Sequence, residues 1–288
     1  MKNKGIWLLC FYAVISLTAC DVFVEGSILQ PFSQRWGAEM EYDDSGATKS
    51  LNVAAVCFDI DLSPEINRNK IVAFIDKIKA EQPNVRLILF SETTLGYYFR
   101  SSNSSGYQKT VAETVPGPTS SILSAKAVEH QIYISFGLVE KSGENLYNSQ
   151  VLLAPDGTIA SVAHKNHLTP EDKKNGISMG KNITVNVIDN IKVATAICSD
   201  LENVEFNKKL NESGAELVLR PAAFTDSVFM DYMMPQQFTY TWVLTSDRTG
   251  NEDGTDYHGM LSLTAPGGEH RIIKRRTEGY IYGVVKCY

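Results

Sequence analysis

The sequence of 288 residues has few cysteines and no excess of positive charge. Its 33 acidic and 27 basic residues give a formal net charge of -6, and the most concentrated basic run is Lys274-Arg275-Arg276. So short a run is typical of a solvated strand end or turn, whereas a nucleic-acid-binding surface needs a wider basic patch. We therefore expect no nucleic-acid partner. Five cysteines exclude a small disulfide scaffold, and a hydrophobic content of 43% excludes a disordered chain.

Beyond the first twenty residues, the sequence also lacks an apolar run long enough to cross a membrane. It contains no internal repeat and no low-complexity tract. From residue 51 onward, short apolar runs alternate with amphipathic stretches without a change in composition. This pattern predicts one α/β domain over residues 51–288, long enough to bury a sizeable core. Residues 21–50 show no sustained period, and we interpret them as a tether and irregular lead-in.

The first twenty residues differ from the rest of the chain. Lys2 and Lys4 precede an almost wholly apolar run over residues 6–17, and the segment ends Leu17-Thr18-Ala19-Cys20. A basic start, a short apolar region and small residues before a cleavage point are typical of a secretory signal peptide. The last four residues resemble a bacterial lipobox, so we predict an exported lipoprotein of the cell envelope, anchored to a membrane surface through acylated Cys20. A plain signal peptide cut near Ala19 and a short buried helix are the alternatives.

Cys10 and Cys20 belong to this leader, which leaves three cysteines in the exported body. An odd number outside the cytosol means that at least one thiol is not in an intramolecular disulfide. Cys57 lies in an apolar run and is interpreted as a core residue, and Cys287 is the penultimate residue. Cys198 is the cysteine with unusual surroundings.

Hydrophobic periodicity predicts an alternation of strands and helices. The dipeptide Asp156-Gly157 between two apolar runs indicates a hairpin. The expected helices cover residues 66–79, 120–130 and 203–210. The expected strands cover residues 51–58, 86–90, 132–137, 147–154, 158–164, 185–187, 193–197, 217–219, 242–244, 261–264 and 279–285.

Three polar residues, Glu92, Lys165 and Cys198, each stand just after the end of an expected strand. The carboxyl ends of strands in α/β folds form the usual ligand crevice, so these side chains are expected to converge. The carboxylate can take the thiol proton, and the ammonium can hold charge that develops on a carbonyl oxygen. A helix expected after Cys198 would bring a positive dipole end near the thiol, which lowers a thiol pKa.

The sequence around these residues contains three ordered motifs. They are Ser91-Glu92 to Gly96-Tyr97, His164-Lys165-Asn166-His167-Leu168 and Ala196-Ile197-Cys198-Ser199-Asp200. Their flanks are Leu146-Tyr147-Asn148-Ser149 with Ala154-Pro155-Asp156-Gly157, residues 214–222, and residues 241–268 ending Ala265-Pro266-Gly267-Gly268. Together these segments, spread over roughly residues 52–285, resemble the nitrilase superfamily, the carbon–nitrogen hydrolases.

The resemblance implies a four-layer α-β-β-α sandwich and a thiol-dependent, amidase-type hydrolase of non-peptide C–N bonds in small molecules. It implies that Glu92 is the general base and acid, Lys165 the oxyanion stabiliser, and Cys198 the nucleophile that forms a thioester. The Ser199 backbone N–H would be the second oxyanion donor, and Glu171 is the nearest match to a second glutamate found in many members. No metal or organic cofactor is implied, and members commonly dimerise through their helical face.

Some positions depart from the common family pattern. His164 stands where Arg often precedes the lysine, and Asp247 stands where Asn is usual. Cys198 is followed by Ser-Asp-Leu-Glu rather than by an aromatic residue and then an acid. These positions shape the pocket more than the chemistry. The substrate class therefore stays open among nitriles, small amides, N-carbamoyl compounds and acyl acceptors.

Several alternatives stay open beside amide hydrolysis. An N-acyltransferase would use the same acyl-enzyme, although the acyltransferases that this sequence resembles carry several membrane-spanning helices. A lipid-anchored binding protein without turnover is an alternative of another class, and a Cys–His hydrolase lacks a recognisable flank around the histidines. His164-x-x-His167 could form half of a metal site, but no other ligand has suitable spacing. Structural roles are expected for both histidines.

Overall fold

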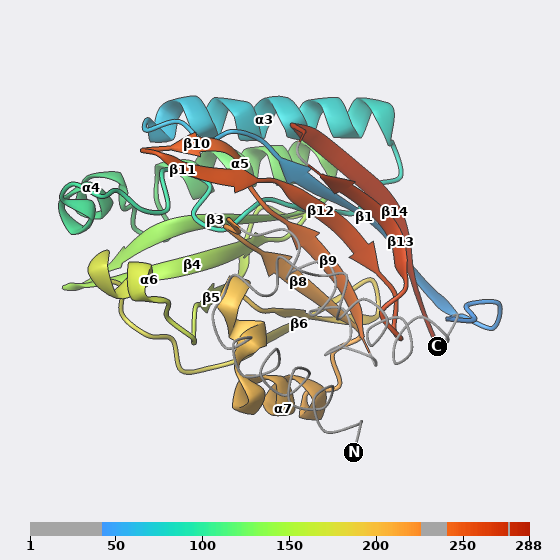
Figure 1. The fold of residues 1–288 in the computed structure, drawn as a ribbon. Coiled ribbons are helices and arrows are strands. Elements are labelled where there is room, and N and C mark those ends of the chain that lie inside the picture. The colour runs from blue at the N-terminus through green and yellow to red at the C-terminus, as the bar shows by residue number, and fades with distance from the viewer. Residues whose placement is uncertain (1–41, 226–240, 276) are drawn as a thin grey trace, which may run out of the picture.

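The computed structural model describes residues 42–225, 241–275 and 277–288 (Figure 1). The expected signal peptide, the Cys20 anchor and most of the 21–50 lead-in lie outside these residues and stay predictions. In the described part of the chain, no helix is long and apolar enough to cross a membrane. The first described strand begins at Lys49, close to the expected start of the domain.

The first of two six-stranded sheets has the strand order β14-β1-β2-β3-β4-β5. Strands β1, β2 and β3 run parallel, and the outer strands join them antiparallel. β14 pairs with β1 along its whole length, from Cys287 opposite Lys49 to Gly279 opposite Cys57. The strands are β1 (Lys49–Cys57), β2 (Leu87–Leu89), β3 (Tyr133–Ser142), β4 (Asn145–Leu153), β5 (Ile159–His164) and β14 (Gly279–Cys287).

The second six-stranded sheet has the order β13-β12-β9-β8-β7-β6. Its strands β7, β8 and β9 run parallel, and the others are antiparallel to their neighbours. The strands are β6 (Thr184–Ile188), β7 (Ile191–Thr195), β8 (Leu217–Pro221), β9 (Trp242–Ser246), β12 (Met260–Thr264) and β13 (His270–Arg275). The chain between β9 and β12 forms a separate hairpin of two antiparallel strands, β10 (Thr249–Glu252) and β11 (Thr255–His258).

Helices cover the outer faces of both sheets and so complete four layers (Figure 1). α3 (Pro64–Glu81) and α5 (Pro118–His130) pack on the first sheet, and α7 (Val204–Glu212) packs on the second. The remaining helices are short: α4 (Ser104–Val111), α6 (Pro170–Lys174) and the 3-10 helix η2 (Cys198–Glu202). The expected α-β-β-α sandwich is therefore confirmed.

The central core lies between the two sheets, where Val53 and Leu89 of the first sheet belong to one apolar cluster with Leu219 and Leu244 of the second. β1 is covered by helices on one face and by the second sheet on the other. Residues 53–57 of β1 are consequently all buried, which explains their unbroken apolar character. The cluster holds the two sheets together, so that loops from both sheets can meet at one end.

The helix expected over residues 203–210 is confirmed as α7, but the short 3-10 helix η2, which was not expected, lies between Cys198 and α7. α7 begins only at Val204, where the side chain of Asn203 caps the helix by accepting a hydrogen bond from the Phe206 N–H. The element that starts at Cys198 is therefore η2, and α7 begins six residues later in the chain. The hairpin β10–β11 and the helices α4 and α6 were not expected, since their short polar segments have little apolar periodicity.

Candidate active site

The three predicted residues each lie beyond the carboxyl end of a strand. Glu92 follows β2 and Lys165 follows β5 in the first sheet, whereas Cys198 follows β7 in the second. Glu92 and Lys165 are 0% exposed, and Cys198 is 6% exposed. The Lys165 ammonium Nζ lies 2.8 Å from Glu92 Oε1, although the two residues are 73 positions apart. The structure thus brings the predicted carboxylate and ammonium into direct contact.

The Lys165 ammonium contacts oxygen atoms of three side chains. Besides Glu92, its Nζ contacts Asp172 Oδ2 at 2.7 Å and the Tyr98 hydroxyl at 3.3 Å. Burial alone would lower the pKa of Lys165, but the negative charge of Glu92 and of its other neighbours outweighs burial and raises the pKa well above the usual value. The side chain is therefore a permanent cation at neutral pH.

Glu92 uses one oxygen for its partners and leaves the other uncommitted. Its Oε1 accepts hydrogen bonds from Lys165 and from the Asn148 side-chain amide, the latter at 2.6 Å. Its Oε2 is buried and has no hydrogen-bond partner among the described residues. A carboxylate fixed through one oxygen can receive a proton on the other. Asn148 belongs to the Leu146–Ser149 motif, but the sequence alone did not assign it a contact.

Cys198 has a strained backbone and a thiol that stays protonated. Its φ of 49° lies in the left-handed region, which costs a non-glycine residue about 1–3 kcal/mol and is found mainly at functional sites. Burial raises the pKa of the thiol well above the usual value, and Glu92 raises it further. Lys165 and the Ala223 backbone N–H act in the opposite direction. The balance of these effects favours the protonated thiol.

A cavity of about 480 Å³ opens beside the thiol. Cys198 and Ser199 form part of its lining, and the Ser199 hydroxyl donates a 2.6 Å hydrogen bond to the His167 carbonyl. The rest of the lining includes four aromatic side chains, three threonines and two glutamates. The aromatic residues are Tyr98, Phe99, Phe224 and Tyr257, and the glutamates are Glu171 and Glu202.

The second carboxylate at Lys165 is Asp172, not Glu171. Thr169 caps α6 in a capping box, in which Asp172 accepts the Thr169 N–H at 3.0 Å and in turn gives its own N–H to the Thr169 hydroxyl. This fold turns Asp172 back toward Lys165 and makes it fully buried. Glu171 is one position away, about 100° around the helix, and lies in the cavity lining instead. The Thr-x-x-Asp spacing was the sequence signal that could have identified Asp172.

Asp200 joins the loop after Lys165 to the loop that carries Cys198. Its Oδ1 accepts the backbone N–H groups of Asn166 and His167, each at 2.7 Å, and its Oδ2 accepts that of Ile197 at 2.9 Å. Burial raises the pKa of Asp200 to about 7, against the lowering effect of these N–H groups. The carboxyl group fixes the position of the nucleophile loop relative to the lysine loop.

Arg248 holds the loop that carries Glu92. The guanidinium is fully buried and donates to the Glu92 carbonyl, to the Thr93 carbonyl at 3.0 Å and to the Gly96 carbonyl at 3.2 Å. It also forms a 2.8 Å ion pair with Glu252. The sequence places Arg248 next to Asp247 in a family motif, but it contains no signal for contacts that cross more than 150 positions of the chain.

Glu252 extends this support to the wall of the cavity. Its Oε2 accepts the Tyr98 backbone N–H at 2.8 Å, and the Tyr98 hydroxyl is in contact with Lys165. Asp247 accepts the N–H groups of Phe224 and Arg248 on one oxygen, at 2.9 and 2.8 Å. Residues 247–252 therefore hold the loop that carries Glu92 and the backbone of Tyr98 and Phe224 in the cavity wall.

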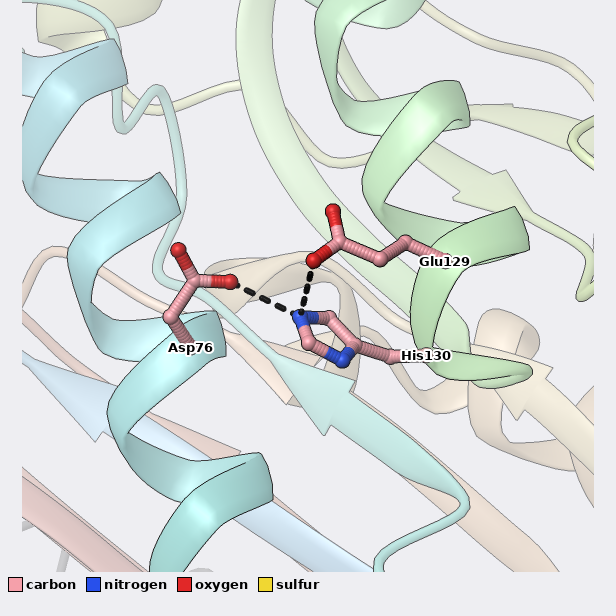
Figure 2. A group of neighbouring side chains, drawn as sticks. All are labelled: Asp76, Glu129 and His130. Atoms are coloured by element: carbon pink, nitrogen blue, oxygen red, sulfur yellow. Dashed lines mark hydrogen bonds and ion pairs between the residues drawn. The ribbon is translucent and has the colours of Figure 1, made fainter.

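A second group of titratable side chains lies on the outer helices, far along the chain from the cavity residues. Asp76 of α3 meets Glu129 and His130 of α5, with His130 Nε2 at 2.7 Å from Asp76 Oδ1 and 3.8 Å from Glu129 Oε1 (Figure 2). Such residue types can bind a metal ion. The Lys126 ammonium, however, contacts the carboxylates of Asp76 and Glu129 at 2.8 and 2.9 Å. We interpret the group as an ion-pair network that joins the two helices.

The two histidines near Lys165 have separate partners. His164 Nε2 contacts Glu140 Oε2 at 2.8 Å, and its ring stacks on Tyr147 with 4.2 Å between centroids. His167 Nδ1 lies 3.4 Å from the Asn203 amide. The structural roles expected for both histidines stay predictions.

Comparisons with known proteins identify the family of this chain. The family model for carbon–nitrogen hydrolases matches residues 52–284. A nitrilase of Pyrococcus abyssi is 28% identical over 226 residues, which cover 75% of this chain and 82% of that protein. An omega-amidase of Danio rerio is 30% identical over 135 residues, or 44% of this chain, and the match spans about half of that relative's length (49%).

Solved structures have the same fold. An amidase from Nesterenkonia sp. superposes with a TM-score of 0.70 at 18% identity, over 84% of this chain and 90% of that one. A carbon–nitrogen hydrolase from Helicobacter pylori G27 gives a TM-score of 0.71 at 18% identity, over 82% and 89%. A mutant of the Nesterenkonia sp. AN1 amidase carries acrylamide added at its active-site cysteine. With a family model that matches most of its length, the chain belongs to the carbon–nitrogen hydrolase family.

Proposed function

We propose that this protein hydrolyses a non-peptide C–N bond of a small amide through an acyl-thioester on Cys198. The observation that carries the proposal is the buried Glu92–Lys165 contact, at 2.8 Å, whose two charges both act on the Cys198 thiol in the cavity wall. The pair places a proton acceptor and a fixed positive charge beside one nucleophile. That combination is what acyl transfer from an amide to a thiol requires.

The first half of the reaction forms the thioester. Glu92 takes the thiol proton as the Cys198 sulfur bonds to the amide carbon, and the carbonyl electron pair moves to oxygen. The resulting oxyanion is stabilised by Lys165 and by the Ser199 backbone N–H. The oxyanion then collapses, the C–N bond breaks, and the leaving nitrogen takes the proton from Glu92. Ammonia or an amine departs and the acyl group stays on sulfur.

The second half releases the acid. A water molecule gives a proton to Glu92 as its oxygen bonds to the thioester carbon, which again produces an oxyanion beside Lys165. When this intermediate collapses, the C–S bond breaks and the sulfur recovers the proton from Glu92. Glu92 acts as base and acid in turn, so its uncommitted Oε2 is the atom we assign to the proton. An amine in place of water would give acyl transfer with the same residues.

Lys165 and Asp172 have different parts in this cycle. Because Glu92 and Asp172 both contact the ammonium, Lys165 keeps its charge and its position while Glu92 gains and loses a proton. Asp172 remains an acceptor throughout and does not face a proton transfer of its own. It is a positioning residue for Lys165.

A panel of primary amides, nitriles and N-carbamoyl compounds tests the proposal. We expect equimolar ammonia and carboxylate from at least one primary amide, and a hydroxamate when hydroxylamine is added to intercept the thioester. Glu92→Gln should abolish both, whereas Glu144→Gln, at an exposed turn between β3 and β4, should not. Absence of ammonia from every amide would contradict hydrolysis, and product formed only with an added amine would identify an acyltransferase. Binding of amides without either product would support the binding-protein alternative.

We also propose that the protein is exported and anchored to a membrane surface through acylated Cys20. The support is the Lys2, Lys4 and Leu17–Cys20 pattern of the sequence. Cys20→Ala should release the protein from the membrane fraction or block its maturation, and unchanged fractionation and migration would contradict the anchor. A homodimer through the helical face is a further proposal, and the mass measured by light scattering would decide it.

A further inference from the structure

The charged side chains that line the active-site cavity have one sign. The lining includes Glu171 and Glu202, and none of its described residues is a lysine or an arginine. Glu171 is half-buried and Glu202 is exposed. We propose that these two glutamates select amides whose non-reacting end carries a positive charge, and that they disfavour amides carrying a carboxylate. This inference rests on the proposed amide hydrolysis.

The two buried cations nearest the reacting group are already paired. Lys165 is matched by two carboxylates, Glu92 and Asp172, and Arg248 is paired with Glu252. That inner group of five charges sums to minus one. Two further cations, Lys174 and Arg220, lie against aromatic rings of the lining but are not themselves among the lining residues.

Each aromatic ring of the lining also makes a cation–π contact with a lysine or arginine of the protein. The cation-to-centroid distances are 5.3 Å for Lys165 and Tyr98, 5.5 Å for Lys174 and Phe99, 4.6 Å for Arg220 and Phe224, and 5.6 Å for Arg248 and Tyr257. A ring that already interacts with one cation attracts a second less strongly, because the first polarises the ring. The attraction for a positively charged substrate is therefore assigned to Glu171 and Glu202 and not to the rings.

At separations of several ångströms in a partly solvated cleft, one charge pair changes a rate or binding constant by about threefold to tenfold. Two glutamates should therefore produce a cation-over-anion preference of about tenfold or more.

Charged thiol reagents measure the field at Cys198 without depending on turnover. We would treat the full chain with aminoethyl and sulfonatoethyl methanethiosulfonate, which differ in the sign of their charge, and follow labelling of Cys198 by peptide mass. Each rate is divided by the rate of the same reagent with mercaptoethanol. We expect the ammonium reagent to be favoured by about tenfold or more. A ratio of one, or a preference for the sulfonate, would overturn the inference while leaving the proposed hydrolysis intact.

Variants assign the preference to the two residues. Glu171→Gln and Glu202→Gln should each lower the ratio by about threefold or more, and the double variant should bring it near one. Glu205→Gln is the matched control, since Glu205 lies three positions from Glu202 but is 65% exposed, pairs with Lys209 and is absent from the lining. A fall in the ratio with Glu205→Gln equal to that with Glu202→Gln would overturn the assignment.

Three amides of equal length test the same charge preference during turnover. γ-Aminobutyramide is cationic, valeramide is neutral and glutaramate is anionic. We expect kcat/KM to fall in that order, and the cation-to-neutral ratio to fall in the double variant. Hydrolysis of all three without this order overturns charge selection alone. If none of the three releases ammonia, both the hydrolysis of short amides and this inference are overturned.

Discussion

Cys57 and Cys198 are both buried thiols, but they lie in regions of opposite character. Cys57 ends β1 in the apolar core between the sheets and is 1% exposed, whereas Cys198 follows β7 at a cavity and has a left-handed backbone. Burial raises the pKa of both thiols. Burial and a raised pKa therefore do not distinguish a nucleophile from a core residue. The distinguishing features are the adjacent cavity and the Glu92–Lys165 pair.

The comparison also shows what the second sheet contributes. The first sheet supplies the charged pair, and the second supplies the thiol on a loop that Asp200 ties back to the lysine loop. Each half alone would be a buried ion pair or a buried thiol. The packing of the two sheets converts them into a site.

The largest expected effect separates the two thiols directly. Cys198→Ala should lower amide turnover by on the order of 10⁴-fold or more, because the covalent route is lost. Cys57→Ala should keep turnover and instead lower the free energy of unfolding by about 1 kcal/mol, through a small cavity in the core. Ammonia release and denaturant unfolding of both variants measure this. Equal losses of turnover in the two variants would contradict the different roles assigned to Cys57 and Cys198.

Removal of the ammonium should have the next largest effect. Lys165→Met should lower kcat by about 10²- to 10³-fold, the size of effect found when one oxyanion donor is removed. It should also leave Glu92 and Asp172 as neighbouring carboxylates without their shared cation. The control is Lys173→Met, an exposed lysine of α6. An unchanged kcat in Lys165→Met would show that Lys165 does not stabilise the oxyanion.

Arg248→Lys tests whether the Glu92 loop must be held in place. A lysine keeps a positive charge for Glu252 but cannot reach the carbonyls of Glu92, Thr93 and Gly96 together. We expect kcat to fall by about tenfold or more, since small misplacements of a base are costly. KM should change less, and the loss should exceed any loss explained by partial unfolding at the assay temperature. An unchanged kcat would reduce Arg248 to a purely structural residue.

The smallest expected effect concerns stability at alkaline pH. Burial raises the pKa of Cys57 above its value of 9.0 in a solvated thiol. The folded chain then keeps a proton that the unfolded chain releases, so stability falls as pH rises above about 9, by up to about 1.4 kcal/mol per pH unit. Cys57→Ala should lose less stability than the wild type between about pH 9 and pH 10. If the free energy of unfolding fell by the same amount in both proteins across that interval, a buried, protonated Cys57 would be contradicted.

The sandwich was predicted from the family resemblance, whereas individual strands and the positions of Glu92, Lys165 and Cys198 after them were predicted from local signals. The apolar run of β1 and the Asp156-Gly157 hairpin are confirmed by the structure. Lys165 and Cys198 stand in short motifs, so their position after a strand could be predicted from neighbouring residues. The contact between Lys165 and Glu92 then followed from the meeting of strand ends at one edge.

Contacts that depend on which face of a helix a residue occupies, or on segments far apart in the chain, could not be predicted from the sequence. Glu171 and Asp172 are adjacent in sequence, and only the capping box at Thr169 decides which of them faces Lys165. The helix expected over residues 203–210 is confirmed as α7, but the 3-10 helix η2 between Cys198 and α7 was not expected. The support of the Glu92 loop by Arg248 depends on the packing of β10 beside that loop, which no local pattern encodes.

The most direct test of the central claim is the mass of the protein during turnover of a slow amide. After rapid acid quenching, we expect an added mass equal to the acyl group, and peptide mapping should place it on Cys198 and on no other cysteine. The adduct should be absent from Cys198→Ala and should disappear when hydroxylamine is added before the quench. An adduct mapped to Cys57 or Cys287, or full turnover in Cys198→Ala, would contradict the thioester mechanism.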